Sequence, residues 1–316
     1  MKKVLLFLFM LGLSSVIFAE DVIRVGLLNG PSCIPAAFLI ENNKEIEGAK
    51  VTTQKFADVP ALLPKMLKNE IDIGFMPLNV AAKVYNSSGA IVCCGITGNG
   101  NLALITKKSD VKRFEDLKGK TVYVAGQGAT PEYMFKYLIE KNELKLGSSD
   151  GVTLSFSIPT AQIVPQLLAD KIQYAVVPEP FATIARMKSK EVVVAIDLQN
   201  EYEYFAGKDS TYPLTVLVAR KGFAENNKDL LDAFLAKYEE SYKQTLRYPK
   251  KAGELCEKLD FGLAAGIVST SIPRANYVFV SSEYARKDAE TLLNLFLAND
   301  EVSIGGKLPD DGFYFR

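Results

Sequence analysis

Residues 64–82 read PKMLKNEIDIGFMPLNVAA, and residues 165–183 read PQLLADKIQYAVVPEPFAT. The two stretches align without a gap, and Pro77 and Pro178 occupy equivalent positions. Each predicts a short helix, a polar turn, a buried strand, and then a proline that ends the strand and opens another helix. The chain therefore contains the same structural unit twice, and this repetition decides the fold class.

Each copy is preceded by a second shared unit. VIRVGLL (22–28) leads through NGPSCIP (29–35) into an apolar helix, and TVYVAG (121–126) leads through QGATP (127–131) into another. Thr130 suits an N-cap position, and the proline that follows it suits the first helical turn. A strand, a glycine-containing turn and a helix with a proline at its start thus occur twice.

Two further strand-like runs mark the crossings between two lobes: NLALITKKS (101–109) and PLTVLVARKG (213–222). Alternating strands and helices predict an α/β fold of two lobes with mostly parallel sheets, joined by a hinge of two crossover strands. The first lobe would take residues 20–106 and 218–316, and the second lobe residues 107–217. Ligands of such sheets bind outside the carboxyl ends of the strands, so we expect a cleft between the lobes that closes by hinge motion.

Composition excludes several classes of function. The 316 residues carry 37 basic and 37 acidic side chains, so no overall charge attracts nucleic acid or an anionic membrane. The chain has no histidine, which is the commonest general base and metal ligand. We expect no cofactor and no metal. The spacing of Cys33, Cys93, Cys94 and Cys256 leaves their disulfide pairing open.

The first residues read MKKVLLFLFMLGLSSVIFAE. A positive start, an apolar run and a small residue predict a signal peptide over residues 1–19, cleaved near Ala19. A membrane anchor is the alternative, but the run is short for a span of about 20 residues. No cysteine lies near the cleavage point, so we expect a periplasmic protein without an attached lipid.

The order of these pieces resembles the periplasmic solute-binding proteins of ABC importers, which have the type II binding fold. The resemblance is greatest to the branch of nitrate, alkanesulfonate, taurine and thiamine-pyrimidine receptors. It covers nearly the whole mature chain and rests on GLLNGPSCIPAAFLIE, IDIGFMPLNVA, FEDLKGKTVYVAGQG and IQYAVVPEPFATIA. It implies a receptor without enzymatic activity that captures a small solute and delivers it to a membrane permease and ATPase. We expect a monomer.

The resemblance also implies that five loops line the ligand site, three from the first lobe and two from the second. Members often carry glycine where this chain has Cys33, which would place a thiol beside the ligand. The candidate ligand-binding residues are Asn29, Gly30, Pro31, Ser32, Cys33, Pro77, Leu78, Asn79, Thr97, Asn99, Gln127, Gly128, Thr130 and Glu179, with Tyr212 as a stacking candidate and Arg274 as a cationic candidate.

The charges of these loops predict the class of ligand. None of the five loops contains lysine or arginine, and one contains Glu179. Anion receptors combine helix N-termini with basic side chains, and an unpaired carboxylate facing a sulfonate in a closed cleft is costly. We therefore favour a neutral or weakly cationic heterocycle, such as a thiamine-pyrimidine-like compound, with Asn79 and Gln127 reading its edges. The alternative is an alkanesulfonate, taurine or another small anion, which Arg274 would favour if it entered the cleft.

Other interpretations stay open at this point. Ser32 also fits a helix cap, Cys33 a small packing residue, Glu179 a solvated turn residue and Tyr212 lobe packing. An enzyme on the same fold is a minor alternative, because the yeast thiamine-pyrimidine synthase relies on histidine and the menaquinone-pathway dehydratase is cytoplasmic. A sensor with the same cleft is a third possibility that the sequence does not exclude.

Overall fold

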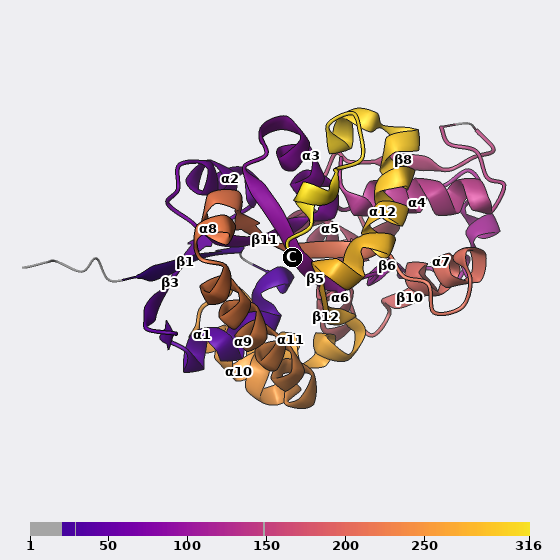
Figure 1. Ribbon diagram of the computed structural model, residues 1–316. Helices are drawn as coiled ribbons and strands as arrows, with labels where there is room; N and C mark the ends of the chain where they lie inside the picture. The colour runs from indigo at the N-terminus through magenta and orange to yellow at the C-terminus, as the bar shows by residue number, and fades with distance from the viewer. Residues whose placement is uncertain (1–20, 29, 148) are drawn as a thin grey trace, which may run out of the picture.

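The computed structural model describes residues 21–28, 30–147 and 149–316. The predicted signal peptide and the candidate Asn29 lie outside the described residues. The chain forms two α/β lobes that lie side by side, one around a seven-stranded sheet and one around a five-stranded sheet (Figure 1). No helix in the described part of the chain has the length and apolar character needed to cross a membrane.

The sheet of the first lobe has the strand order β12-β5-β11-β4-β1-β3-β2. Four of its strands run in the same direction: β1 (Val22–Leu28), β3 (Ala49–Phe56), β4 (Ile73–Pro77) and β5 (Ile91–Asn99). The other three are antiparallel to their neighbours: β2 (Glu45–Ile46), β11 (Pro213–Arg220) and β12 (Tyr277–Ser281).

The sheet of the second lobe has the order β10-β6-β9-β7-β8. Its common direction is shared by β7 (Thr121–Val124), β8 (Thr153–Ser155), β9 (Tyr174–Pro178) and β10 (Val193–Asp197), while β6 (Leu102–Thr106) is antiparallel. Both sheets are therefore mixed. Most strands of each sheet run in one direction, as expected. Many neighbouring strands are nevertheless antiparallel, because β6 and β11 each lie between two strands that run the opposite way.

The crossing strands pair in the lobe that they enter. β6 pairs over its whole length with β9, and β11 pairs with both β4 and β5. The expected lobe boundaries, 106/107 and 217/218, fall at the end of β6 and inside β11. We therefore infer that the chain crosses at residues 100–101 and 207–212.

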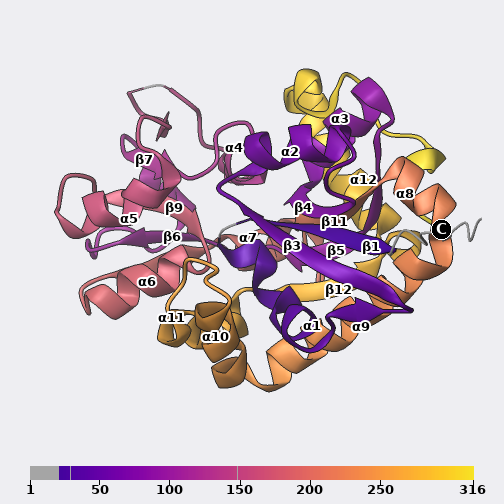
Figure 2. The same ribbon diagram turned by 90° about the vertical axis from the view of Figure 1, so that its left-hand side faces the viewer.

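Helices cover both faces of each sheet (Figures 1 and 2). In the first lobe one face packs against η1 (Pro31–Ala36), α1 (Ala37–Asn42), α8 (Lys221–Asn226), α9 (Lys228–Arg247), α10 (Pro249–Lys258), α11 (Ala265–Ser271) and η3 (Ile272–Arg274). The other face packs against α2 (Val59–Leu67), α3 (Leu78–Ser88), α12 (Ser282–Asn299), η4 (Glu301–Ile304) and η5 (Asp311–Phe313). In the second lobe α5 (Thr160–Leu168) and α6 (Phe181–Lys188) cover one face, and η2 (Phe114–Leu117), α4 (Thr130–Lys141) and α7 (Leu198–Ala206) cover the other.

The repeated unit predicted from the sequence is present in both lobes. α2 and β4 in the first lobe correspond to α5 and β9 in the second, and each strand ends on its shared proline. The polar turns match as well, since Asn69 and Asp170 both adopt left-handed backbone conformations, with φ of 61° and 58°. Asparagine and aspartate tolerate this conformation, which ends the helix and turns the chain into the strand.

Candidate functional site

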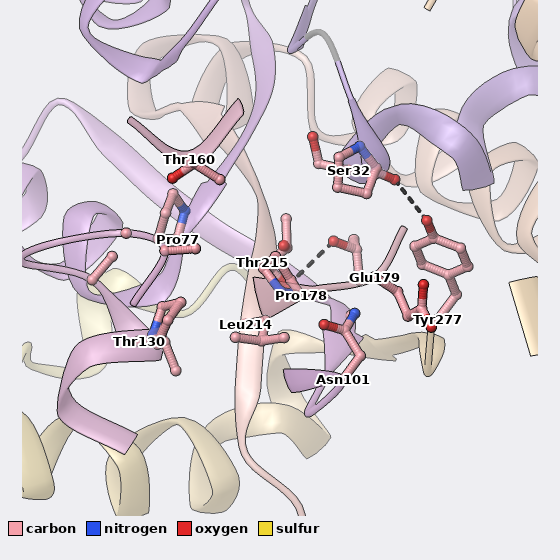
Figure 3. A pocket seen from close by; sticks show the side chains of 17 residues that line it. Ser32, Pro77, Asn101, Thr130, Thr160, Pro178, Glu179, Leu214, Thr215 and Tyr277 are labelled. Carbon is pink, nitrogen blue, oxygen red and sulfur yellow. Dashed lines mark hydrogen bonds between the residues drawn. The ribbon is translucent and has the colours of Figure 1, made fainter. Parts of the chain in front are cut away.

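A cavity of about 240 Å³ lies between the lobes, at the carboxyl ends of β1, β4, β5, β7 and β9 (Figure 3). This is where ligands bind in sheets of this kind. The first lobe contributes Pro31, Ser32, Pro77, Thr97, Thr215 and Tyr277, and the second contributes Asn101, Gly126, Thr130, Thr160, Pro178 and Glu179, among others. Figure 3 shows Pro77, Thr130 and Thr160 on one side, and Ser32, Glu179 and Tyr277 on the other.

Glu179 is the one charged side chain in the described wall of the cavity, which contains no lysine or arginine. It follows β9 directly and is only 5 % exposed. Its Oε2 accepts a hydrogen bond from the backbone N–H of Thr183, 3.1 Å away in the first turn of α6. Burial raises the pKa of Glu179 above its ordinary value. Hydrogen bonding from Thr183 and, less strongly, the charges of Arg274 and Arg186 oppose that rise. The carboxylate is thus held by a helix start and kept from bulk water.

Asn101 and Thr130 bring polar atoms without partners to the same cavity. Asn101 donates its Nδ2 to the carbonyl of Ala275, 2.8 Å away, and this bond turns Oδ1 away from Ala275. Neither Oδ1 of Asn101 nor Oγ1 of Thr130 has a hydrogen-bond partner among the described residues, although both are buried. Buried polar atoms are rarely left unpaired, so a bound molecule or water is expected to satisfy them.

Tyr277 supplies an aromatic surface. It is the first residue of β12, lies 7 % exposed in the cavity wall, and donates its hydroxyl to the carbonyl of Pro31, 3.0 Å away. Burial first, and then neighbouring thiol, tyrosine and carboxyl groups, raise the pKa of Tyr277 well above its ordinary value. The hydroxyl therefore stays protonated and fixes the ring against the start of η1.

Three helices begin at the cavity. Pro77 precedes α3, Thr130 opens α4 and Thr160 opens α5, and all three residues line the cavity. The positive ends of these helices favour partial negative charge on a ligand. Together with the acceptors on Glu179 and Asn101, they create a site for a small molecule that both donates and accepts hydrogen bonds.

Several candidates from the sequence do not line the cavity. Cys33 and Leu78 are fully buried in the apolar cores, where the Cys33 thiol donates to the carbonyl of Leu28, 2.9 Å away. Burial raises the pKa of Cys33 to about 12, so the thiol is neutral. Gly30 has φ of 116° and donates to the carbonyl of Phe261. Gly30 and Cys33 shape the segment after β1 and Leu78 begins α3, and none of the three reaches the cavity.

The polar candidates near the start of α4 have other partners. Asn79 donates its Nδ2 to the carbonyl of Gly128, 2.9 Å away, so the two residues join the lobes rather than line the cavity. Gln127 is exposed, and Asn99 lies buried at the end of β5, outside the cavity wall. In this structure the Asn79 Nδ2 binds backbone and the Gln127 side chain is exposed, so neither residue lies in the cavity wall, and the expectation that they read a ring edge stays a prediction.

The stacking candidate Tyr212 and the cationic candidate Arg274 also lie away from the cavity. Tyr212 is fully buried, with its ring centroid 5.2 Å from that of Tyr202, and packs where the chain returns to the first lobe. Arg274 is exposed and donates to the carbonyl of Thr270, 3.1 Å away. Neither lines the cavity. The aromatic surface comes instead from Tyr277, which no local signal marks because its strand reaches the site only by long-range pairing with β5.

Neither a metal site nor a disulfide is present among the described residues. No group of three or more histidine, cysteine, aspartate or glutamate side chains in this part of the chain is arranged to hold a metal ion. The four cysteines are all buried and free, so the disulfide left open by the sequence does not form here.

Comparison with known proteins identifies the family. The NMT1-like family matches residues 23–257, which is more than half of the chain. No curated protein shows significant similarity to the sequence. A crystal structure of an ABC transporter from Parabacteroides distasonis shares 27% identity, covers 93% of this chain and 99% of its own, and superposes with a TM-score of 0.79.

Two more distant structures share the fold. The periplasmic aliphatic sulphonate binding protein from Escherichia coli has 17% identity, coverage of 92% and 93%, and a TM-score of 0.70. The periplasmic nitrate-binding protein from Synechocystis has 12% identity, coverage of 90% and 84%, and a TM-score of 0.63. The chain thus belongs to the NMT1-like family and has the two-lobed fold of the periplasmic binding proteins of ABC transporters.

Proposed function

We propose that the protein is the extracytoplasmic substrate-binding component of an ABC importer and holds a small solute in the cavity between its lobes. The observation that carries this proposal is the position of the cavity, which both lobes line at the carboxyl ends of their parallel strands. The predicted signal peptide supports a periplasmic location. Family membership supports a receptor rather than an enzyme, and a permease and an ATPase would be its partners.

The solute that fits best is a neutral or weakly cationic heterocycle with at least one N–H donor, such as a thiamine-pyrimidine-like compound. The Glu179 carboxylate and the unpaired Asn101 Oδ1 would accept from ring amines, and Tyr277 would stack on the ring. Helix starts at Thr130 and Thr160 would face ring nitrogens or oxygens. A cavity of roughly 150 Å³ holds benzene, so about 240 Å³ suits one substituted ring.

A small anion is the second candidate. It is favoured by the three helix starts at the cavity, and two proteins of the same fold are described as binding sulphonate and nitrate. The buried Glu179 opposes it, because a second negative charge in the same enclosed site is repelled and no basic side chain in the described wall compensates.

Titration calorimetry with paired probes tests the proposal. We expect heat and saturation with an aminopyrimidine that carries a hydroxymethyl group, and none with an alkanesulfonate. Saturable binding of the alkanesulfonate, with no response to any heterocycle, would reject the ligand class and retain the receptor. Binding of neither probe, in a protein that also releases no solute on unfolding, would count against the receptor itself.

A steric variant shows whether binding takes place in this cavity. Gly98 lines it, and a Cβ at this position would meet no neighbouring atom closer than 3.9 Å. We expect Gly98→Val to fill part of the cavity and abolish binding while the far-ultraviolet circular dichroism and the urea midpoint stay unchanged. Ala236→Val, at an exposed position of α9 outside the cavity wall, is the control. Equal binding by both variants would place the solute elsewhere.

A further inference from the structure

The chain carries a local excess of positive charge at the corner where α9 ends and α10 begins. Residues 241–253 read SYKQTLRYPKKAG and contain four basic side chains and no acidic one. Lys243 and Lys251 each pair with a glutamate of their own helix, with distances of 2.6 and 3.0 Å from Nζ to the carboxylate oxygen. Arg247 and Lys250 have no ion pair in the described part of the chain. Their charges are therefore open to a partner.

Two large apolar side chains are exposed at the same corner. Leu246 is 40% exposed in the last turn of α9, and Tyr248 is 47% exposed between the two helices. The Arg247 guanidinium lies over the Tyr248 ring, with its Cζ 5.3 Å from the ring centroid. Tyrosine beside basic residues is the combination that anchors proteins at the boundary between lipid headgroups and water.

α11 extends this corner with an uncharged face. Residues 261–273 contain no charged side chain, and α11 packs against α10. A surface groove takes its lining from both sides of this contact and includes Arg247, Tyr248, Lys250, Ser269 and Thr270. Figures 1 and 2 show α10 at the lower rim of the molecule, where a flat surface can approach it. Residues 246–251 together with Ser269 and Thr270 form one surface, the basic corner.

We propose that the basic corner binds the surface of an anionic lipid bilayer. Lipid phosphates would meet Arg247 and Lys250, while Leu246 and Tyr248 would enter the headgroup layer. The corner is much smaller than the roughly 20–30 residues that each partner contributes to a stable protein interface, whereas a bilayer needs only a few cations and inserted side chains. This inference goes beyond the proposed function, because none of these residues lines the cavity and the solute plays no part in it.

Flotation with lipid vesicles tests the proposal on residues 20–316. We expect the protein to float with vesicles of phosphatidylcholine and phosphatidylglycerol, to stay behind with phosphatidylcholine alone, and to be released by high salt. Each cation near an anionic surface strengthens binding about fivefold, so Arg247→Glu with Lys250→Glu should lower the partition coefficient by at least about 25-fold. Lys145→Glu with Lys190→Glu, at exposed positions of the second lobe, is the matched control because it changes the net charge equally.

A fluorescent reporter shows which surface of the protein meets the bilayer. The chain has no tryptophan, so Tyr248→Trp and Tyr204→Trp each introduce a single indole at an exposed position, one in the basic corner and one on α7. We expect the emission of the first to move to shorter wavelength when anionic vesicles are added, because its indole leaves water. The emission of the second should stay unchanged.

Three results would overturn the proposal: no flotation with the anionic vesicles, an equal loss of binding in the two double variants, or an equal emission shift at both reporters. Binding of a polyglutamate peptide without flotation would also reject the bilayer and assign the basic corner to an acidic protein. Circular dichroism checks that the double variants are folded, and the reporters test the proposal without any change of charge.

Discussion

At the residue scale, the properties of the site depend most on Glu179. Its carboxylate is buried, accepts from the first turn of α6 and has no basic side chain beside it in the described cavity wall. Such a group is unfavourable unless it is paired, and in the proposed function a donor on the solute would be its further partner. Under that proposal Glu179 would distinguish a donor-bearing ring from an anion.

Neutralising this carboxylate should weaken binding of a heterocycle. Hydrogen bonds to charged groups contribute about 1.5–3 kcal/mol, so we expect Glu179→Gln to reduce affinity by roughly 10–150-fold for a ligand whose amine meets the carboxylate. Calorimetry with the aminopyrimidine measures the loss. Glu283→Gln, on the exposed first turn of α12, is the control and should bind normally. Unchanged affinity in Glu179→Gln would assign Glu179 to capping α6 only.

The raised pKa of Glu179 gives binding and stability opposite responses to pH. The ionised form accepts from the solute, so affinity should rise as pH increases through the raised pKa, which lies above the ordinary 4.5. The buried neutral form is the more stable one, so its contribution to folding is complete below pH 4.5 and is lost as pH rises through the raised pKa. Titrations from pH 4 upward measure the first effect, and urea unfolding over the same range measures the second.

Glu179→Gln serves as the reference in both experiments because glutamine does not titrate. Relative to the native protein, its stability should improve as pH rises. An identical pH profile of affinity in the two proteins would show that another group governs the response.

At the element scale, an ion cluster ties three strands of the first lobe together at the end far from the cavity. Asp72, at the start of β4, is fully buried. It accepts from Arg24 on β1, with Nε 2.7 Å from Oδ2 and Nη2 2.9 Å from Oδ1, and from Nη2 of Arg220 on β11 at 3.0 Å. The cluster joins the returning crossover strand to the parallel core.

Removing the shared carboxylate should be costly. Removing one partner of a buried ion pair lowers the free energy of unfolding by about 3–5 kcal/mol. Because both arginines are partly exposed, we expect a loss of about 3 kcal/mol for Asp72→Ala, at the lower end of that range. Urea unfolding measures the change. Asp232→Ala removes an exposed pair with Lys228 and should cost less than about 1 kcal/mol. Equal costs for the two variants would mean that the cluster adds nothing beyond a surface pair.

Most elements could be predicted from the sequence because their signals are local. The shared prolines end β4 and β9, and Asn69 and Asp170 occupy matching turns. The antiparallel position of β6 and β11 could not be predicted, because an apolar strand that is buried on both faces fits between two others in either direction. Tyr277 was missed for a related reason, since the pairing of β12 with β5 spans most of the chain.

At the scale of the whole molecule, duplication explains where the site lies. Two similar α/β units facing each other bring the loops after β1 and β4 opposite those after β7 and β9. Pro31, Ser32, Pro77, Thr97, Thr130 and Glu179 were placed at this cavity from the sequence, and the structure brings them together there. Their role in binding stays a prediction, as do the signal peptide and the monomeric state.

The asymmetry of the lobes could not be predicted from the repeat. It comes from α12, which has no counterpart in the repeated unit and packs against α4 of the other lobe through Phe296. α12, which the repeated unit lacks, thus joins the apolar cores of the two lobes on the side of α4.

The most direct test of the central claim is to identify the solute that the purified protein carries. Residues 20–316 would be expressed with an export signal, purified without refolding, and unfolded, and the released small molecules would be identified and counted by mass spectrometry. The account predicts about one heterocycle with an N–H donor and no strongly acidic group per protein chain, and its absence from Gly98→Val. A stoichiometric sulfonate, nitrate or other anion released by the native protein and not by the variant would contradict it.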